Sequence, residues 1–406
     1  MDQNAKPGGN RFVIVACEAS GDLLGEGLAE ALRERFPDCR LEGIGGARME
    51  AAGVELWHRY DVLNVMGIAE VLKHLPRLLR LRKEVVARSL AADPDVFIGI
   101  DGPDFNLGVE KRLKAKGVKT VHYVSPSIWA WREGRAKKIK AAADRVLCLF
   151  PMEAPIYARY DMPATYVGHP LANTFETDPD KVEARVRLNI SRYGQWLGLL
   201  PGSRVSEVNQ LGRIFMQAAL LVRRQHPGLH LLVPMANERS KEAFLGVLDR
   251  LHEPGDGDSI RAEEREWAAL RANTSVVDGK SHDVMKAADA LLLASGTAAL
   301  EGMLAKRPMV VAYRIAPLTH FIVKGLGILK INRYSLPNIL ADKPIVPELM
   351  QDDCTPDSIA KTLLGMLDES GAGAAQVAHF HEQHERLRGT GSAGAAEAIG
   401  EVAARS

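Results

Sequence analysis

The sequence contains no hydrophobic run long enough to cross a membrane. No stretch of about 18 consecutive apolar residues occurs, whereas a transmembrane helix needs about 20. The first ten residues, MDQNAKPGGN, also lack the apolar region of a cleavable secretory signal. We therefore expect a cytoplasmic protein that neither spans the membrane nor is secreted by such a signal.

Cysteine is scarce, and its spacing excludes the common metal motifs. The chain has four cysteines, Cys17, Cys39, Cys148 and Cys354, with no CxxC pair. Cys17 and Cys148 lie in apolar, strand-like runs. This pattern predicts buried free thiols in a reducing compartment and no structural metal site.

The chain also lacks an excess of either charge. It has 52 Lys and Arg against 51 Asp and Glu, which argues against nucleic acid as the main partner. Its 406 residues are too many for one ordinary hydrophobic core. We therefore expect two domains.

The most informative stretch is Ala290–Arg314, ALLLASGTAALEGMLAKRPMVVAYR. An apolar strand is followed by the small polar turn Ser295-Gly296-Thr297, a helix and a second strand. Free amides and the helix dipole at such a helix start favour an anion. Glu301, one turn later, is placed to reach a sugar hydroxyl beside that anion. An ordinary capped helix in an α/β core is the alternative.

A second candidate anion contact follows the predicted strand Trp196–Leu200. The next residues are Pro201-Gly202-Ser203-Arg204, and a helix is expected from about Ser206. The guanidinium of Arg204 is suited to a diphosphate because its fork pairs two oxygens at once. The alternative is a surface arginine with no ligand.

The first half of the chain opens with the same strand-loop-helix pattern. The strand Arg11–Ala16 leads into a loop that contains Ser20, Gly21 and Asp22. The loop lacks the GxGxxG fingerprint, which disfavours a dinucleotide oxidoreductase. These residues either bind a ligand or cap the next helix.

Asp101 is the candidate catalytic residue. It directly follows the predicted strand Asp95–Ile100, in the sequence IDGPDFN. Ligands of parallel sheets bind at the carboxyl ends of the strands, where a carboxylate can take a proton from a hydroxyl. The alternatives are that Asp101 only forms the turn, or that Asp104 is the base.

An amphipathic helix is predicted over Met66–Val86. One interpretation is that its apolar stripe packs in the core. The other is that it docks on a bilayer and its cations meet anionic headgroups. The residues expected to contact the membrane are Ile68, Val71, Leu72, Leu75, Leu79, Arg77 and Arg80.

The whole chain therefore indicates two consecutive halves of βα units. We expect an α/β protein with two doubly wound, Rossmann-like domains that face a cleft. The predicted domains are an acceptor- and membrane-facing domain over 1–175 and a donor-binding domain over 185–375. A helical tail over 376–406 is expected to pack back on the first domain.

Seven stretches in this order resemble the lipid-A-disaccharide synthase family of bacterial glycosyltransferases. They are ACEASGD, IGIDGPDFN, YVSPSIWAW, YVGHPL, LLPGSR, ASGTAALE and YSLPNIL. The resemblance covers roughly Phe12 to Glu348 and implies the two-Rossmann fold called GT-B. It implies transfer from UDP-2,3-diacylglucosamine to 2,3-diacylglucosamine 1-phosphate, giving a β-1,6-linked disaccharide 1-phosphate and UDP.

The resemblance also implies roles for particular residues. Asp101 matches the general base for the acceptor hydroxyl, and Arg204, after Ser203, matches the diphosphate contact. The other donor contacts that it implies are Ser295, Gly296, Thr297, Glu301 and Asn338. The Ser20-Gly21-Asp22 loop is expected near the acceptor.

The resemblance further implies an inverting, metal-independent reaction without a cofactor. It implies an enzyme on the cytoplasmic face of the inner membrane, and a homodimer is compatible with the family. Two other functions stay open. One is a GT-B transferase or epimerase acting on UDP-N-acetylglucosamine, and the other is a non-catalytic nucleotide-sugar binder with no requirement for Asp101.

Overall fold

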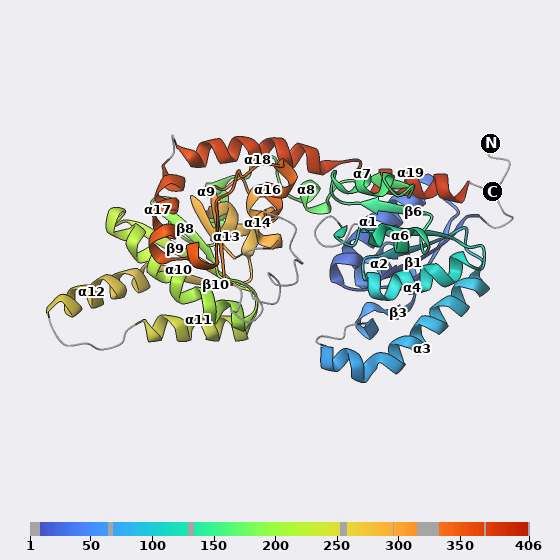
Figure 1. Cartoon of the computed structure of the whole chain (residues 1–406), viewed down its shortest axis with the longest axis horizontal. Coiled ribbons are helices and arrows are strands. Elements are labelled where there is room, and N and C mark those ends of the chain that lie inside the picture. The colour runs from blue at the N-terminus through green and yellow to red at the C-terminus, as the bar shows by residue number, and fades with distance from the viewer. Residues whose placement is uncertain are drawn as a thin grey trace. The chain divides into compact units, whose positions relative to one another are not determined.

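The structure is a computed structural model that divides the chain into two compact units. The first contains Met1–Asn173 and Arg386–Ser406, and the second contains Thr174–Glu385 (Figure 1). The described residues are 9–63, 68–128, 134–251, 258–294, 296–314, 333–368 and 371–404, and the side chains of 68–74 and 258–263 are not described.

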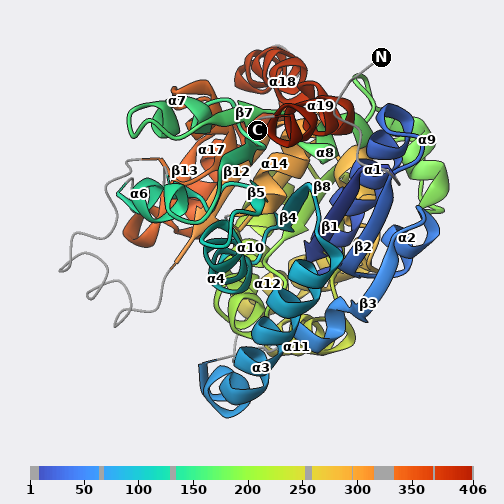
Figure 2. The same cartoon turned by 90° about the vertical axis from the view of Figure 1, so that its right-hand side faces the viewer.

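The first unit is built on a sheet of parallel strands in the order β3-β2-β1-β4-β5-β6-β7. Figure 2 shows β3, β2, β1 and β4 side by side in this order. The two central strands, β1 and β4, are continuous apolar runs because helices cover a parallel sheet on both faces. The strands are β1 (Arg11–Ala16), β2 (Arg40–Gly45), β3 (Glu55–Arg59), β4 (Val96–Ile100), β5 (Lys119–Tyr123), β6 (Arg145–Cys148) and β7 (Ala164–Tyr166).

The helices of the first unit follow its strands along the chain. They are α1 (Ala19–Arg35), α2 (Ala47–Ala51), the 3₁₀ helix η1 (Tyr60–Leu63), α3 (Ile68–Ala92), α4 (Pro103–Lys114), α6 (Arg135–Lys140), α7 (Glu153–Ala158) and α19 (Gly391–Ala403). Two further helices contain the unit boundaries, α8 (Pro170–Thr174) and α18 (Ala372–Arg388).

The last helix completes the core of the first unit. Ala395, Ala396, Ile399 and Val402 of α19 pack in one cluster with apolar residues of α1 and of the sheet, including Leu28. The end of the chain is therefore part of this core and does not form a separate body.

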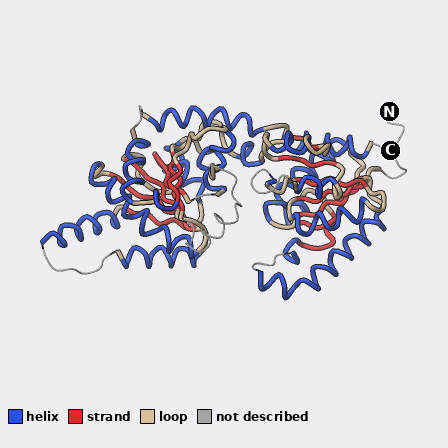
Figure 3. Tube along the Cα trace, in the orientation of Figure 1, coloured by secondary structure: helices blue, strands red, loops and turns tan. Residues whose placement is uncertain are grey.

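The second unit has a parallel sheet in the order β10-β9-β8-β11-β12-β13. Figure 3 shows the strands in the middle of each unit with helices around them. The strands are β8 (Gln195–Leu200), β9 (Leu229–Met235), β10 (Thr274–Asp278), β11 (Ala290–Leu293), β12 (Met309–Tyr313) and β13 (Glu348–Met350). The helices are α9 (Lys181–Arg187), α10 (Val205–Gln225), α11 (Glu238–Arg250), α12 (Asp258–Ala272), α13 (Ser281–Ala287), α14 (Thr297–Leu304), α16 (Leu336–Ala341), the 3₁₀ helix η2 (Gln351–Asp353) and α17 (Pro356–Leu367).

In both sheets, the direction in which successive strands are added reverses at one point. The reversal lies between β1 and β4 in the first unit and between β8 and β11 in the second. In open parallel sheets, ligands bind beyond the carboxyl ends of the two strands at such a switch point. The predicted α/β class with two doubly wound sheets is confirmed, and each sheet has one position where a ligand is expected.

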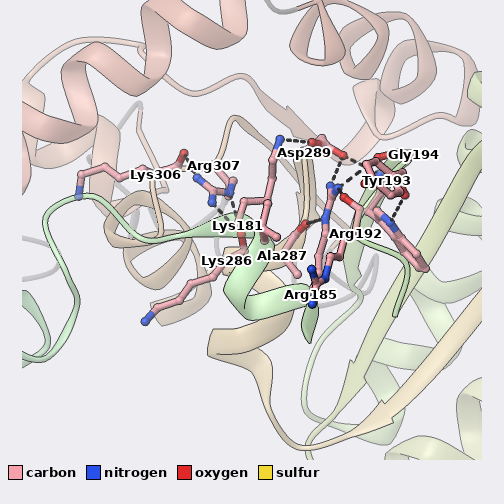
Figure 4. A network of polar contacts seen from close by, with 12 residues as sticks. Lys181, Arg185, Arg192, Tyr193, Gly194, Lys286, Ala287, Asp289, Lys306 and Arg307 are labelled. Atoms are coloured by element: carbon pink, nitrogen blue, oxygen red, sulfur yellow. Dashed lines mark hydrogen bonds and ion pairs between the residues drawn. The ribbon is translucent and has the colours of Figure 1, made fainter. Parts of the chain in front are cut away.

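A buried arginine holds the amino-terminal ends of β8 and β11 together. Arg185 donates to the carbonyls of Ala287 at 3.0 Å and Arg192 at 2.8 Å, and to Asp289 Oδ2 at 2.8 Å (Figure 4). The same Asp289 oxygen accepts the amide of Trp196 at 2.7 Å. This network sets the relative position of the two strands whose other ends carry the candidate site.

None of the helices in the described residues combines the length and apolarity needed to span a bilayer.

Candidate functional site

The second unit has a pocket at the switch point of its sheet. Its volume is about 480 Å³, and it lies at the carboxyl ends of β8 and β11. The described residues that line it are Leu200, Gly202, Ser203, Arg204, Glu207, Pro234, Met235, Ala236, Gly279, Ser281, Ala294, Gly296, Thr297, Ala298, Glu301 and Tyr313. The structure therefore gathers most of the predicted donor contacts in one place.

The start of α14 forms one wall of this pocket. Gly296 precedes the helix with φ 112°, a backbone conformation that favours glycine. Gly296 and Thr297 both line the pocket, whereas Ser295 lies outside the described residues. The amides of a first helical turn have no partner within the helix, and the dipole is positive there. This wall favours a bound anion.

The start of α10 forms another wall, and a carboxylate occupies its amides. Glu207 Oε2 accepts the amides of Ser203 at 3.1 Å and Arg204 at 3.3 Å. A Cβ atom at Gly202 would lie 2.4 Å from this oxygen, so only glycine leaves room for it. Glu207 was not predicted as a site residue. The spacing of a glutamate three residues after the N-cap was the available signal.

Arg204 carries the exposed positive charge of the pocket. Its Nη1 lies 3.3 Å from Glu207 Oε1, and its side chain is 79% exposed. A side chain so exposed is free to turn toward a ligand. Tyr313 lines the pocket beside this pair, and burial, followed by the charge of Glu207, raises the pKa of its hydroxyl.

Glu301 is a half-buried carboxylate on the pocket wall. Its Oε1 lies 3.4 Å from His282 Nε2, and the imidazole ring packs on Phe175 with ring centres 4.7 Å apart. A carboxylate on the pocket wall can accept hydrogen bonds from the vicinal hydroxyl groups of a sugar.

Asp101 lies at the switch point of the first sheet, directly after β4. Its backbone has φ 50°, and its amide donates to the Tyr123 carbonyl at 2.8 Å. Burial raises the pKa of its carboxyl group, the Gly102 amide opposes this rise, and the negative charge of Glu18 adds to it. A carboxyl with a raised pKa is a better proton acceptor near neutral pH.

Asp104 is the alternative base, and it is more exposed than Asp101. It lies in the first turn of α4, where a carboxylate also stabilises the helix dipole. Its carbonyl accepts Arg82 Nη2 at 2.6 Å. The structure therefore gives Asp104 a role in its own helix, whereas Asp101 lies at the strand end.

Ser20, Gly21 and Asp22 belong to the first turn of α1 and not to the loop before it that the sequence predicts, and they have structural partners within the first unit. Asp22 is 4% exposed. Its Oδ1 accepts the amide of Gly46 at 2.6 Å, and Oδ2 accepts that of Arg48 at 3.2 Å. Asp22 thus caps α2 from within α1, because its carboxylate faces the orphan amides there. The Ser20 hydroxyl bonds to Glu18, and Gly21 is buried.

Asn338 has no donor left for a ligand. It is 2% exposed, and its Nδ2 lies 2.8 Å from both the Val346 carbonyl and Glu348 Oε1. Its Oδ1 accepts the Val346 amide at 2.7 Å. It is not among the described residues that line the pocket. Its side chain holds α16 to the segment before β13.

The helix α3 has an exposed apolar face. Leu75 is 43% exposed and Leu79 is 40% exposed, while Leu81 and Val85 pack in the core. The helix runs without interruption through Pro76. Arg77 donates to the Val62 carbonyl at 2.9 Å, and Arg80 is exposed. The side chains of Ile68, Val71 and Leu72 are not described.

Comparison with known proteins gives a consistent family. The model of the lipid-A-disaccharide synthetase family matches residues 12–399. A lipid-A-disaccharide synthase from Xanthomonas campestris pv. campestris (strain 8004) is 51% identical over 392 residues, which cover 97% of this chain and 86% of the relative.

Solved structures share the fold at low sequence identity. The glycosyltransferase of kitacinnamycin has a TM-score of 0.59 at 17% identity, covering 98% of this chain and all of that one. A UDP-GlcNAc 2-epimerase from Neisseria meningitidis, bound to UDP-GlcNAc, has a TM-score of 0.55 at 10% identity. The match covers 96% of this chain and 98% of the epimerase chain. At these identities the likenesses show a shared α/β fold.

Proposed function

This chain belongs to the lipid-A-disaccharide synthetase family, and from this membership we propose the reaction that it catalyses. It transfers the diacylglucosamine of UDP-2,3-diacylglucosamine to the 6-hydroxyl of 2,3-diacylglucosamine 1-phosphate. The products are a β-1,6-linked disaccharide 1-phosphate, the precursor of lipid A, and UDP.

The pocket of the second unit is the observation that supports the donor most directly. It combines the start of α14, an exposed guanidinium at Arg204 and a half-buried carboxylate at Glu301. These three groups match the diphosphate and the ribose hydroxyls of a uridine diphosphate. The amides at Gly296 and Thr297 and the Arg204 side chain bind the phosphates, and Glu301 accepts the ribose hydroxyls.

The same groups stabilise the leaving diphosphate. Negative charge grows on its oxygens as the glycosidic bond to UDP breaks. Preorganised amides and a guanidinium stabilise such charge without reorganising, so they lower the barrier of this step. We propose that they do so without a metal ion, and treatment with EDTA tests this.

Asp101 acts as the general base for the acceptor hydroxyl. An inverting displacement needs one base that takes the proton as the hydroxyl attacks the anomeric carbon. Asp101 is partly buried at the switch point of the first sheet, and burial raises its pKa toward the range useful for this role. Such a base typically contributes about 10²–10⁴ to the rate.

The exposed leucines of α3 bring the enzyme to a lipid surface. Both substrates carry acyl chains, so an enzyme at the bilayer meets them without full extraction. Leu75 and Leu79 supply apolar area, and Arg77 and Arg80 supply positive charge for anionic headgroups. We place the enzyme at the cytoplasmic face of the inner membrane.

We also propose that the enzyme is a homodimer. Light scattering of the purified protein tests this.

The decisive experiment measures UDP release from both acylated substrates in the presence of EDTA. The proposal expects UDP only when donor and acceptor are present together, at a rate that EDTA leaves unchanged. UDP release from the donor alone would indicate a hydrolase. Absence of release together with turnover of UDP-N-acetylglucosamine would instead favour an enzyme of the epimerase type.

A further inference from the structure

A polar cluster lies buried beneath the loop that carries Asp101. It consists of Asn106 and Glu110 on α4 and His122 on β5, and each of the three is 0% exposed. Glu110 Oε1 lies 2.7 Å from His122 Nδ1. Asn106 and Glu110 are four residues apart on one helix, so they share the face that packs against the sheet.

Asn106 connects this cluster to the backbone of the candidate base. Its Nδ2 lies 2.8 Å from the Asp101 carbonyl, 3.2 Å from the Ile100 carbonyl and 3.1 Å from the Val15 carbonyl. The two hydrogens of one amide group therefore hold the ends of β4 and β1 together. Asp101 needs such a restraint because its φ of 50° is left-handed, which costs a non-glycine residue roughly 1 kcal/mol.

The absence of a side chain at Gly99 on β4 leaves room for the polar cluster. A Cβ atom at Gly99 of β4 would lie 2.2 Å from Glu110 Oε1 and 2.8 Å from Asn106 Cβ. Any side chain at this position would displace the carboxylate or the amide. The glycine and the two polar residues are thus one local arrangement, located two residues before Asp101.

Stability does not explain the cluster. Asn106 Oδ1, Glu110 Oε2 and His122 Nε2 are buried and have no hydrogen-bond partner among the described residues. Each such atom costs about 1–3 kcal/mol. Replacing a buried charged pair with apolar residues is often neutral or stabilising, so a purely structural role would favour apolar side chains here.

We propose that Asn106, Glu110 and His122 are positioning residues for Asp101. Asn106 holds the Asp101 backbone in its left-handed conformation. Glu110 holds the His122 imidazole at 2.7 Å, and the positive charge of this histidine acts on the Asp101 carboxylate. This proposal rests on the function proposed above, in which Asp101 is the base.

The charged groups around Asp101 agree with this arrangement. Among them, the positive charge of His122 lowers the pKa of Asp101, and the negative charge of Glu18 raises it. Glu110 faces the same region from α4, and Cys17 faces it from the end of β1. Burial, followed by the charge of Asp101, raises the pKa of the Cys17 thiol to about 12, so this thiol stays neutral.

The test is the pH profile of kcat/KM for Glu110→Gln in the full chain. Without the carboxylate, the His122 side chain loses the partner that holds it in place, so its positive charge no longer acts on Asp101 from this position. The pKa of Asp101 then rises and the acid limb moves to higher pH by about one unit, a roughly tenfold loss on the acid side. The rate on the alkaline plateau stays near that of the wild type.

Controls separate this effect from a structural one. Glu42→Gln changes a partly buried carboxylate in the same unit, bonded to Trp57 Nε1 at 2.9 Å, and is expected to leave the profile in place. Asn106→Ala is expected to lower kcat about tenfold at every pH, with KM unchanged, because it removes a restraint and not a charge. His122→Gln is expected to shift the limb as Glu110→Gln does, and serves if that variant fails to fold.

The outcomes are distinct. An upward shift of the acid limb with an unchanged plateau supports the network. An unshifted limb in a folded Glu110→Gln or His122→Gln variant overturns it, even if the rate falls uniformly. Asp101→Asn shows separately whether the limb belongs to Asp101: if that variant retains the wild-type rate, the proposed base is wrong, and the failure lies with the proposed function.

Discussion

Arg204 Nη1 lies 3.3 Å from Glu207 Oε1, so the guanidinium that we assign to the diphosphate is already paired with a carboxylate. The same carboxylate accepts the amides at the start of α10. A diphosphate bound by Arg204 therefore meets a negative charge in its immediate surroundings. The pocket contains both an attractive and a repulsive element for its proposed ligand.

Glu207→Gln is expected to tighten UDP binding several-fold, because it removes the repulsion while its amide oxygen still accepts the backbone amides. Uridine, which has no phosphates, should bind as it does to the wild type. Calorimetric titration with both ligands measures the difference. Equal affinity of variant and wild type for UDP would show that the phosphates do not approach this carboxylate.

Arg204→Ala is expected to weaken UDP binding by about 10–100-fold, since a charge-assisted hydrogen bond to phosphate is worth about 1.5–3 kcal/mol. The effect on uridine should be much smaller. Arg213→Ala on the same helix, whose side chain does not line the pocket, is a suitable control. An equal loss for UDP and uridine would exclude contact between Arg204 and the phosphates.

Asp101→Asn is expected to lower kcat by about 10²–10⁴ while UDP affinity stays within about twofold of the wild type. In the wild type, kcat/KM should fall as the pH decreases through the Asp101 pKa, because the protonated carboxyl cannot accept a proton. Burial raises this pKa, so the fall occurs above the ordinary range of an aspartate. Steady-state kinetics over pH measure both effects, and retention of activity would move the assignment to Asp104.

The double substitution Leu75→Ser and Leu79→Ser is expected to release the protein from anionic phosphatidylglycerol vesicles without unfolding it. Burying a leucine is worth about 1.5–3 kcal/mol, so binding should fall more than tenfold. Leu90→Ser is the matched control, since Leu90 lies on the same helix and is 39% exposed. Sedimentation with vesicles gives the bound fraction; equal sedimentation of the double variant and the control would assign these leucines no membrane role.

Asn338→Ala is expected to destabilise the second unit by roughly 2–4 kcal/mol, because it leaves the buried amide and carbonyl of Val346 without their partners and removes one hydrogen bond from Glu348. Asn273→Ala, which removes a hydrogen bond of 2.8 Å to Ala269, should cost less. Denaturant unfolding measures both. Wild-type stability of Asn338→Ala combined with weak UDP binding would instead restore a direct contact with the donor.

The fold was accessible from sequence because its signals are local. Apolar runs such as Phe12–Ala16 and Ala290–Leu293 are buried on both faces of a parallel sheet, and small polar residues mark the strand ends. Strand order follows from the βα connections, which place the loops after β8 and β11 at one switch point. The pocket follows from that order, so the sequence places Arg204, Gly296 and Thr297 beside it by their positions along the chain.

Other contacts could not be predicted from the sequence. They join residues that are far apart along the chain, or they depend on the direction in which a side chain points. Asp22 was expected to bind a ligand or to cap its own helix, yet its carboxylate meets amides 24 to 27 residues away. Nothing local shows that Asn338 faces Val346. The pairing of Glu110 with His122 requires the register of α4 on β5, which periodicity alone does not specify.

The position of α19 in the core of the first unit has a consequence for synthesis on the ribosome. The second unit is contiguous in sequence, whereas the first needs Ala395–Val402 to fill its core. At about 5–20 residues per second, the roughly 210 residues of the second unit take about 10–40 s to translate. During that interval the nascent first unit exposes the apolar face of α1 that α19 later covers, so the unit begun first is the last to be completed.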